Sequence, residues 1–162
     1  MVETKVTYLG VYITQGSRRL SSDRVQGILQ LPSPTTRKQL RAFLGLTGCC
    51  RIWIPNCSLI AQPLYESLKG RDDSIPLMWG TPQKKAEATL KQALTQALAL
   101  RLPDPEKAFQ LYVREREATA LGVLTQRLGS EPRPVAYLSK RLDSKPPEAG
   151  PPAFEILQLL QS

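Results

Sequence analysis

The sequence predicts an α+β fold: a β-hairpin, then a bundle of helices, then an antiparallel meander followed by one helix. Three observations carry this prediction. Residues 6–14 are rich in β-branched and aromatic side chains, a helical period of apolar residues runs between residues 36 and 98, and short strand-like runs alternate with turns after Pro103. With 162 residues and 41% hydrophobic side chains, the chain can build one ordinary domain or two small ones.

The first predicted element is the hairpin. Residues 6–14 read VTYLGVYIT and favour a strand, Gln15-Gly16-Ser17 favours a turn, and residues 18–20 can form the returning strand. Gly10 interrupts the first strand. We expect it to mark a bulge or a place where another backbone comes close.

The first helix is predicted over roughly residues 37–52. Thr36, with Gln39 three residues later, forms a capping box at its start, and Pro55 ends the run. Apolar and small residues then recur at helical spacing. This stripe consists of Leu40, Phe43, Leu44 and Thr47.

Two further helices are predicted before the composition changes. One covers residues 58–69, where Pro63 either kinks the helix or opens a new first turn. The other begins with Thr81 as N-cap and Pro82 at the first helical position, and runs to about residue 98.

The last third of the chain is predicted to form the meander. Residues 109–113, 120–126 and 134–139 are strand-like, and the turn at residues 128–130 suits an antiparallel connection. Residues 154–161 are predicted to begin a helix. Its apolar face would be only partly covered, as would the meander on which it packs.

The charge of the chain favours an anionic partner. The net charge is +8, and residues 1–60 hold eight basic and two acidic side chains. Such a surplus favours polyanions, of which nucleic acid is the commonest, and points to the first third as the binding part. The chain has no histidine, which excludes Ser-His-Asp and Cys-His catalysis and zinc sites that need imidazole.

Three cysteines, Cys49, Cys50 and Cys57, form an odd and tightly spaced set. We interpret them as reduced thiols of an intracellular protein of the cytoplasm or nucleus. The sequence shows no signal peptide and no apolar stretch of the roughly 20 residues that would span a bilayer. We therefore expect no membrane association and no secretion.

Several longer strings carry a family resemblance. They are VTYLGVYIT, QLRAFLGLTG followed by WIP, FQLYV, GVLTQRLG and RPVAYLSKRLD. In this order they resemble the C-terminal part of a retroviral reverse transcriptase, of the gammaretroviral type and its endogenous relatives. The resemblance covers nearly the whole chain with few gaps.

The resemblance implies a division of the chain and a partner. Residues 1–27 would be the palm-end primer-grip hairpin, residues 28–100 the helical thumb, and residues 101–162 a truncated RNase H-like connection domain. The primer grip would lie at Tyr8, Leu9 and Gly10. The partner would be an RNA/DNA template–primer duplex, bound weakly and without sequence choice, and no cofactor is implied.

The resemblance also implies that the first helix tracks the minor groove, and its residues fit that role. Arg41, Gly45 and Cys49 are spaced by four and share one face. A mid-helix glycine costs about 1 kcal/mol against alanine, which is explained if a sugar–phosphate edge must approach. Arg37 and Lys38, at the helix start, are expected to reach phosphates. The alternative is a solvated basic face with an incidental glycine. The family often has an aromatic residue where Cys49 stands.

The chemistry of the family's enzymes is missing. Nucleotidyl transfer and RNase H cleavage need carboxylates that hold metal ions, and the family's Tyr-x-Asp-Asp string is absent. Asp72-Asp73 lies in a polar loop and is interpreted as a solvated turn. The family's first RNase H carboxylate corresponds to Arg114, Glu115 should point the other way, and Glu155 corresponds to the helix glutamate. We therefore predict no catalytic or metal-binding residue, and no enzymatic activity in isolation.

Three functions stay open at this point. The first is a non-catalytic reverse-transcriptase fragment that grips the duplex, and the second is a host-retained interaction or structural protein. The third is a relic without a selected function. A basic patch of Arg133, Lys140 and Arg141 could contact the template–primer or be merely solvated. A protein partner could cover the truncated sheet.

Overall fold

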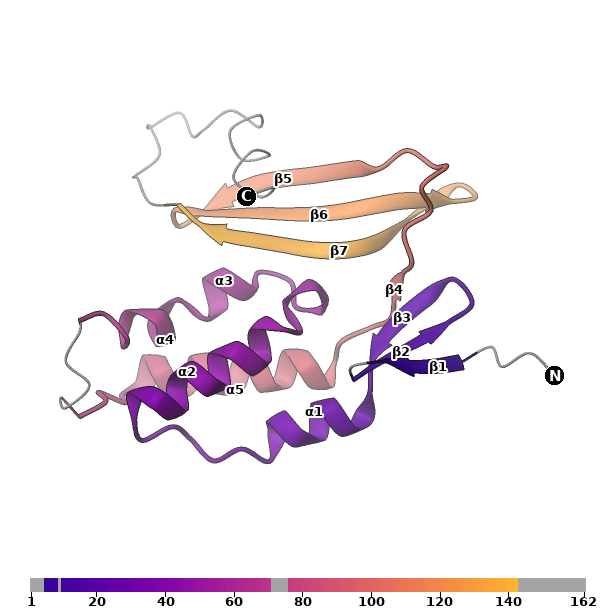
Figure 1. The fold of residues 1–162 in the computed structure, drawn as a ribbon. Helices are drawn as coiled ribbons and strands as arrows, with labels where there is room; N and C mark the ends of the chain where they lie inside the picture. Colours follow the sequence, from indigo (N-terminus) through magenta and orange to yellow (C-terminus); the bar gives the residue numbers. More distant parts are fainter. Residues whose placement is uncertain (1–4, 9, 71–75, 143–162) are drawn as a thin grey trace.

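The computed structural model describes residues 5–8, 10–70 and 76–142. Figure 1 shows a layer of helices with a three-stranded sheet lying over it and a second, smaller sheet beside the helices. Both sheets are antiparallel. The predicted α+β class is confirmed for this part of the chain. The helix predicted over residues 154–161, the doublet Asp72-Asp73 and Glu155 lie outside the described residues.

The smaller sheet is a meander with a distant fourth strand. Its consecutive strands are β1 (Lys5–Tyr8), β2 (Val11–Thr14) and β3 (Ser17–Leu20). β4 (Leu100–Arg101), from far along the chain, pairs with β3. The predicted single strand over residues 6–14 is therefore wrong, because the chain turns back at Gly10. The turn predicted at residues 15–17 is confirmed.

Gly10 occupies a position that a side chain would disturb. Its φ of +79° lies in the left-handed region. The Ser21 amide donates to the Gly10 carbonyl oxygen at 2.8 Å. A Cβ at this position would lie 2.5 Å from Nε of Arg24. The expected close approach of another backbone is thus present, and it belongs to the turn into the first helix.

That helix, α1 (Ser22–Leu29), was not predicted. The Ser21 hydroxyl caps it by accepting from the Arg24 amide at 3.1 Å. Ile28 is its one fully buried side chain. The helix is only eight residues long and contains Gly27, although Val25, Ile28 and Leu29 have helical spacing.

α2 (Arg37–Gly48) begins where the capping box predicts and ends earlier than predicted. The Thr36 hydroxyl accepts from the Gln39 amide at 3.1 Å. At the other end the Thr47 hydroxyl donates to the carbonyl oxygens of Phe43 and Leu44, and Cys50 N bonds to the Thr47 oxygen. The bond between Cys50 N and the Thr47 oxygen is of the 3₁₀ type, and a 3₁₀ turn, η1 (Arg51–Trp53), follows.

The remaining helices are α3 (Cys57–Ile60), α4 (Gln62–Glu66) and α5 (Thr81–Thr95). Pro63 lies in the first turn of α4, so the second of the two predicted alternatives is confirmed. α5 is capped by Gly80, one residue before the predicted Thr81. The Gly80 amide donates to Oε1 of Gln83 at 3.0 Å.

The helices enclose one apolar core. The predicted stripe of α2 faces it together with residues of α1, α3, α4 and α5. Its buried members are Ile28, Leu40, Phe43, Leu44, Cys50, Ile54, Cys57, Ala61, Leu64, Ala86, Leu90 and Leu94.

The larger sheet consists of β5 (Gln110–Arg116), β6 (Thr119–Leu128) and β7 (Glu131–Arg141), in that order. The three predicted strands are confirmed, and each is longer than predicted. β7 is the strand that packs on the helical layer, against η1 and α3. The predicted domain limits at residues 27/28 and 100/101 fall inside α1 and β4, and the division into three domains stays a prediction.

Candidate nucleic-acid interface

One side of α2 is exposed along its whole length. Lys38, Arg41, Gly45 and Cys49 are all exposed and are called the α2 face below. The apolar stripe of the same helix is buried in the core. The helical period therefore separates a packing side from a solvent side, as the sequence predicts.

Space above Gly45 is open. A Cβ built there would meet no other atom of the described chain within 4 Å. Packing of the fold therefore does not require glycine here, although glycine costs about 1 kcal/mol in a helix interior. A surface that approaches the helix from outside would give the glycine a physical reason.

Arg37 lies elsewhere than expected. Its side chain is only 8% exposed, and Nη1 and Nη2 each donate to the Lys69 carbonyl oxygen at 3.3 Å. The guanidinium ties the start of α2 to the end of the α4 region. The structure thus separates Arg37 from the exposed Lys38 beside it, and Arg37 is not part of the α2 face.

The predicted primer-grip residues are only partly described. Tyr8 ends β1, Gly10 forms the following turn, and Leu9 lies outside the described residues. Arg24 lies beside this turn, with its guanidinium against the position of a Gly10 Cβ. Sequence reasoning missed this cation. The Ser21 cap, which starts α1 three residues earlier, was the available signal.

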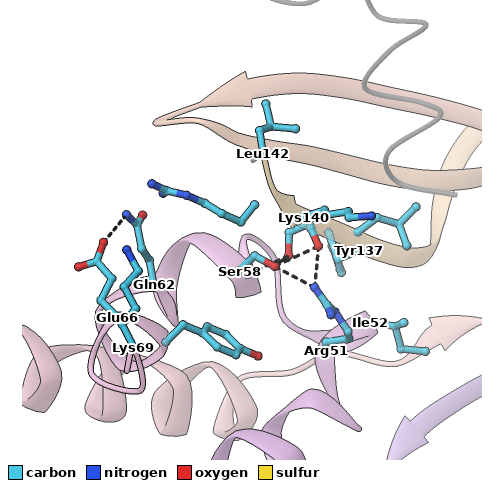
Figure 2. Close-up of a pocket in the computed structure, with 13 residues that line it drawn as sticks. Arg51, Ile52, Ser58, Gln62, Glu66, Lys69, Tyr137, Lys140 and Leu142 are labelled. Carbon is cyan, nitrogen blue, oxygen red and sulfur yellow. Dashed lines mark hydrogen bonds between the residues drawn. The ribbon is translucent and has the colours of Figure 1, made fainter. Parts of the chain in front are cut away.

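A groove that sequence reasoning did not predict is lined by residues of η1, α3, α4 and β7. Its volume is about 810 Å³, and Figure 2 shows its lining. Four cationic side chains line it, and Glu66 is the single acidic residue among its lining residues. The cations are Arg51, Lys69, Lys140 and Arg141.

The predicted basic patch on the last strand is divided by this geometry. Lys140 and Arg141, at the end of β7, line the groove. Arg133 lies near the start of β7 and forms an exposed ion pair with Glu131 at 3.1 Å. The three residues therefore do not form one surface.

Hydrogen bonds at the base of the groove join the helical layer to β7 (Figure 2). Nη2 of Arg51 donates to the Ser58 hydroxyl at 2.8 Å and to the Ser139 carbonyl oxygen at 2.6 Å. The Ser58 amide donates to the Ser139 hydroxyl at 2.9 Å. This cluster of Arg51, Ser58 and Ser139 is called the serine clasp below.

The residues discussed for RNase H chemistry do not form a metal site in the described part. Arg114 is exposed on β5 opposite Leu121. Oε1 of Glu115 accepts from the Ala118 amide at 2.7 Å, which supports the turn between β5 and β6. Within residues 5–8, 10–70 and 76–142, no three His, Cys, Asp or Glu side chains gather in a way that could hold a metal ion.

The three cysteines are free thiols with different surroundings. Cys49 is exposed, whereas Cys50 and Cys57 are buried. Burial raises the pKa of Cys50 to about 11, and burial also raises the pKa of Cys57. Among the described helices, none is both long and apolar enough to cross a bilayer.

Comparison with known proteins identifies the class. Residues 79–153 match the family described as the RNase H-like domain found in reverse transcriptase. A foamy viral protease–reverse transcriptase solved in complex with double-stranded DNA aligns with a TM-score of 0.76 and 28% identity, over 87% of this chain and 24% of that one. The same enzyme solved with an RNA/DNA hybrid covers 99% of this chain and 21% of that one, with a TM-score of 0.75 and 26% identity. The chain is therefore a reverse-transcriptase segment with an RNase H-like domain.

Sequence relatives give the type more narrowly. The chain is 54% identical to the Gag-Pol polyprotein of avian reticuloendotheliosis virus, over 88% of this chain and 12% of that one. It is 46% identical to the Gag-Pol polyprotein of baboon endogenous virus (strain M7), over 96% of this chain and 9% of that one. These matches place it with the C-terminal region of reverse transcriptase in gammaretroviral-type Pol, and the predicted family is confirmed. The chain spans only about a tenth of the length of these relatives.

Proposed function

We propose that this chain is a non-catalytic part of a retroviral reverse transcriptase that grips the primer–template duplex. The observation that carries the proposal is the α2 face, where the exposed cations Lys38 and Arg41 precede Gly45, above which the space is open. The foamy viral enzyme to which the chain is similar was solved with double-stranded DNA and with an RNA/DNA hybrid, which supports a duplex as the ligand.

The chemistry of the face suits a grip without sequence choice. Lys38 and Arg41 offer positive charge to phosphates, which contributes affinity but reads no base. Gly45, one turn after Arg41, lets a sugar–phosphate edge approach the helix backbone. Gly10 and Tyr8 are proposed to hold the primer end, as the family resemblance implies. Binding should therefore be weak, tolerant of sequence and sensitive to salt.

The proposal assigns no chemical step to this chain. Metal-dependent nucleotidyl transfer and RNase H cleavage both need clustered carboxylates, and the position expected to hold the first RNase H carboxylate is Arg114. Purified protein should therefore show no magnesium-dependent primer extension and no cleavage of an RNA/DNA hybrid. Activity that copurifies with the chain and survives removal of contaminating polymerase would overturn this part.

The duplex proposal is tested by charge reversal. Lys38→Glu with Arg41→Glu should weaken binding of a short fluorescent RNA/DNA hybrid by about tenfold or more, and should lower the salt dependence by about two ions. Lys84→Glu with Lys85→Glu makes the same charge change on the exposed side of α5. This control should lose far less affinity. Equal losses from both pairs would show a diffuse charge effect and contradict a specific α2 face.

A second candidate function rests on β5. This strand is an edge strand in the described sheet, and Phe109 and Tyr112 beside and on it are 48% and 57% exposed. Apolar side chains on an unpaired edge favour a protein partner that covers the sheet. Sedimentation velocity tests self-association as the simplest form. A concentration-dependent dimer that Tyr112→Arg abolishes would support it, and a monomer at all concentrations would count against a second copy as the cover.

A further inference from the structure

The groove between the helical layer and β7 is lined by cationic and aromatic residues that are not part of the α2 face. Its lining comes from η1, α3, α4, the segment after α4 and β7, and no lining residue belongs to α2. It is a concave site of about 810 Å³. Pockets of about 300–1,000 Å³ take small ligands or single units of a polymer. A site of this size is too small for a double helix.

The charged residues that line the groove are mostly positive. Arg51, Lys69, Lys140 and Arg141 face a single acidic residue, Glu66. Oε1 of Glu66 accepts from Nε2 of Gln62 at 3.1 Å, so this carboxylate is already hydrogen bonded within its own helix. The cations come from three separate segments, and Lys69 and Lys140 lie on either side of Ser58 in the view of Figure 2. The lining of the groove therefore offers positive charge to phosphates from more than one segment.

The groove also offers aromatic surface. Tyr65 on α4 lines it and is 51% exposed. Tyr137 on β7 lines it from the opposite element. Tyr137 is less exposed than Tyr65. An exposed aromatic ring among cations is the combination by which proteins bind single-stranded nucleic acid, since a base stacks on the ring while the backbone follows the positive charge.

The floor of the groove is fixed before any ligand arrives. The serine clasp holds α3 against β7 through bonds of 2.6–2.9 Å. Nη2 of Arg51 is used in this clasp. Lys69 and Arg141 are exposed side chains that line the groove, and Nη1 of Arg141 also donates to the Glu117 carbonyl oxygen at 3.2 Å. A rigid floor in a groove lined by exposed cations reduces the entropy lost on binding.

We propose that this groove is a second nucleic-acid site, which binds a short single-stranded polynucleotide with its phosphates against Lys69, Lys140 and Arg141 and a base against Tyr65. This site is separate from the α2 face. It would hold an unpaired strand that leaves the duplex, or an unpaired strand bound by itself. The proposal can fail or hold independently of the duplex-gripping function.

The test measures two ligands on the same variants. Fluorescence anisotropy follows a short fluorescent oligothymidylate and a short RNA/DNA hybrid of equal phosphate number. Lys69→Glu with Arg141→Glu should weaken oligothymidylate binding by about tenfold or more and leave the hybrid within about twofold. The salt slope for the single strand should fall by about 1.4, because each lost phosphate contact removes about 0.7. Lys38→Glu with Arg41→Glu should do the opposite: this pair should weaken binding of the hybrid more than binding of oligothymidylate.

A neutral substitution separates stacking from charge. Tyr65→Ala should weaken the single strand by about fivefold or more, whereas Tyr65→Phe should keep the affinity, because the ring is retained. Circular dichroism confirms that each variant is folded. Unchanged oligothymidylate binding in the Lys69/Arg141 pair would overturn the proposal, as would equal losses on both ligands. If adenosine monophosphate binds as tightly as oligothymidylate, the ligand of the groove is a free nucleotide and the proposal of a single-stranded polynucleotide is wrong. If only the hybrid fails to bind, the duplex function is contradicted and this site stands.

Discussion

Two glycines in this chain have opposite surroundings, and so opposite reasons for being glycine. Gly10 is crowded by Arg24 and adopts a positive φ. Gly45 lies in a regular helix with open space around it. Backbone geometry explains the first within the fold. Nothing within the described fold requires the second to be glycine, and the proposed function gives it a reason, because a duplex edge would approach the helix there.

Replacing Gly45 by alanine should therefore stabilise the fold and weaken binding at the same time. The expected gain in the free energy of unfolding is about 0.5–1 kcal/mol, from the higher helix propensity of alanine. Affinity for an RNA/DNA hybrid should fall, because the methyl group occupies the approach path. Gly27→Ala is a matched control, since its position is also helical and open. It should stabilise similarly and leave affinity unchanged. Urea denaturation and anisotropy measure the two effects, and unaltered affinity in Gly45→Ala would contradict the close approach.

Arg37 and Lys38 are neighbours in sequence with different roles. Arg37→Met should lower the free energy of unfolding by about 1–3 kcal/mol, because the Lys69 carbonyl oxygen loses its charged donor. Lys38→Met, at an exposed position, should change stability by less than about 0.5 kcal/mol. Affinity for the duplex should instead fall more in Lys38→Met than in Arg37→Met. A larger loss of affinity in Arg37→Met than in Lys38→Met, with both folded, would place Arg37 on the binding surface after all.

The buried thiols make the fold sensitive to alkaline pH. Cys50 has its pKa raised from 9.0 to about 11 by burial, so the folded protein keeps a proton that the unfolded chain releases above about pH 9. The stability contributed by this group is complete below pH 9 and is lost as the pH rises toward 11. Cys57 acts in the same direction. Chemical denaturation should therefore show stability falling between pH 9 and 11, with a shallower fall in Cys50→Ala. An equal slope in the variant would assign the effect to other groups.

At the scale of single elements, the turn between β5 and β6 is an unusual one. Glu117 and Ala118 have φ values of 51° and 57°, and Arg116 pairs with Thr119 across them. Two residues of positive φ define the turn that Asn-Gly normally occupies. The Glu115 carboxylate, which accepts from the Ala118 amide, holds it in place. Glu115 is adjacent to Arg114, the position that the resemblance aligns with the first RNase H carboxylate, and its own carboxylate stabilises this local turn.

Restoring the preferred turn residues should stabilise the sheet. Glu117→Asn with Ala118→Gly relieves the steric cost of left-handed backbone, and we expect a gain of about 1 kcal/mol in the free energy of unfolding. The urea midpoint measures it. A lower midpoint would mean that the flanking strands, and not the turn residues, fix this geometry.

Sequence patterns predicted elements well where the relevant bonds are local. The Thr36 hydroxyl caps α2 by accepting from the Gln39 amide, as predicted from residues three apart. The reciprocal half of the predicted capping box is not formed, because Oε1 of Gln39 accepts from the Thr35 amide and hydroxyl instead. The early end of α2, where Cys50 N bonds to the Thr47 oxygen in a 3₁₀ pattern, has no local sequence signal before Pro55. α1 was missed although Ser21 caps it and Val25, Ile28 and Leu29 have helical spacing, because it is only eight residues long and contains a glycine. The two-residue strand β4 is defined only by its distant partner β3.

At the scale of the whole molecule, long-range polar contacts join β7 of the larger sheet to the helical layer and to β3 of the smaller sheet. Besides the serine clasp, Nη2 of Arg18 donates to the Val135 carbonyl oxygen at 2.7 Å. Ser58 and Ser139 are 81 residues apart, and no local pattern could predict that they meet. The groove beside them could not be predicted from the sequence for the same reason. The α2 face could be predicted because a single helical period places its residues.

Breaking the serine clasp should loosen β7 without unfolding the helices. Ser139→Ala leaves the Ser58 amide without its hydroxyl acceptor, which costs about 1–2 kcal/mol. Hydrogen exchange followed by mass spectrometry should show faster exchange in β7 and unchanged exchange in α5. Ser130→Ala, in the exposed turn before β7, is the control and should change neither. Uniformly faster exchange in both elements would show that sheet and helices unfold as one unit.

The pairing of β3 with β4 sets an order of events when the chain folds. Arg18 meets Leu100, 82 residues later, so this small ladder closes a loop that contains all five α-helices of the described chain. Closing a long loop costs conformational entropy, and the strand pairing stabilises the fold only after the loop has closed. Helices form within about a microsecond and their local contacts follow quickly, whereas distant strand pairs wait for the chain ends to be brought together. The helical bundle should thus form first and carry residues 17–18 and 100–101 to each other, so that the smaller sheet is completed last.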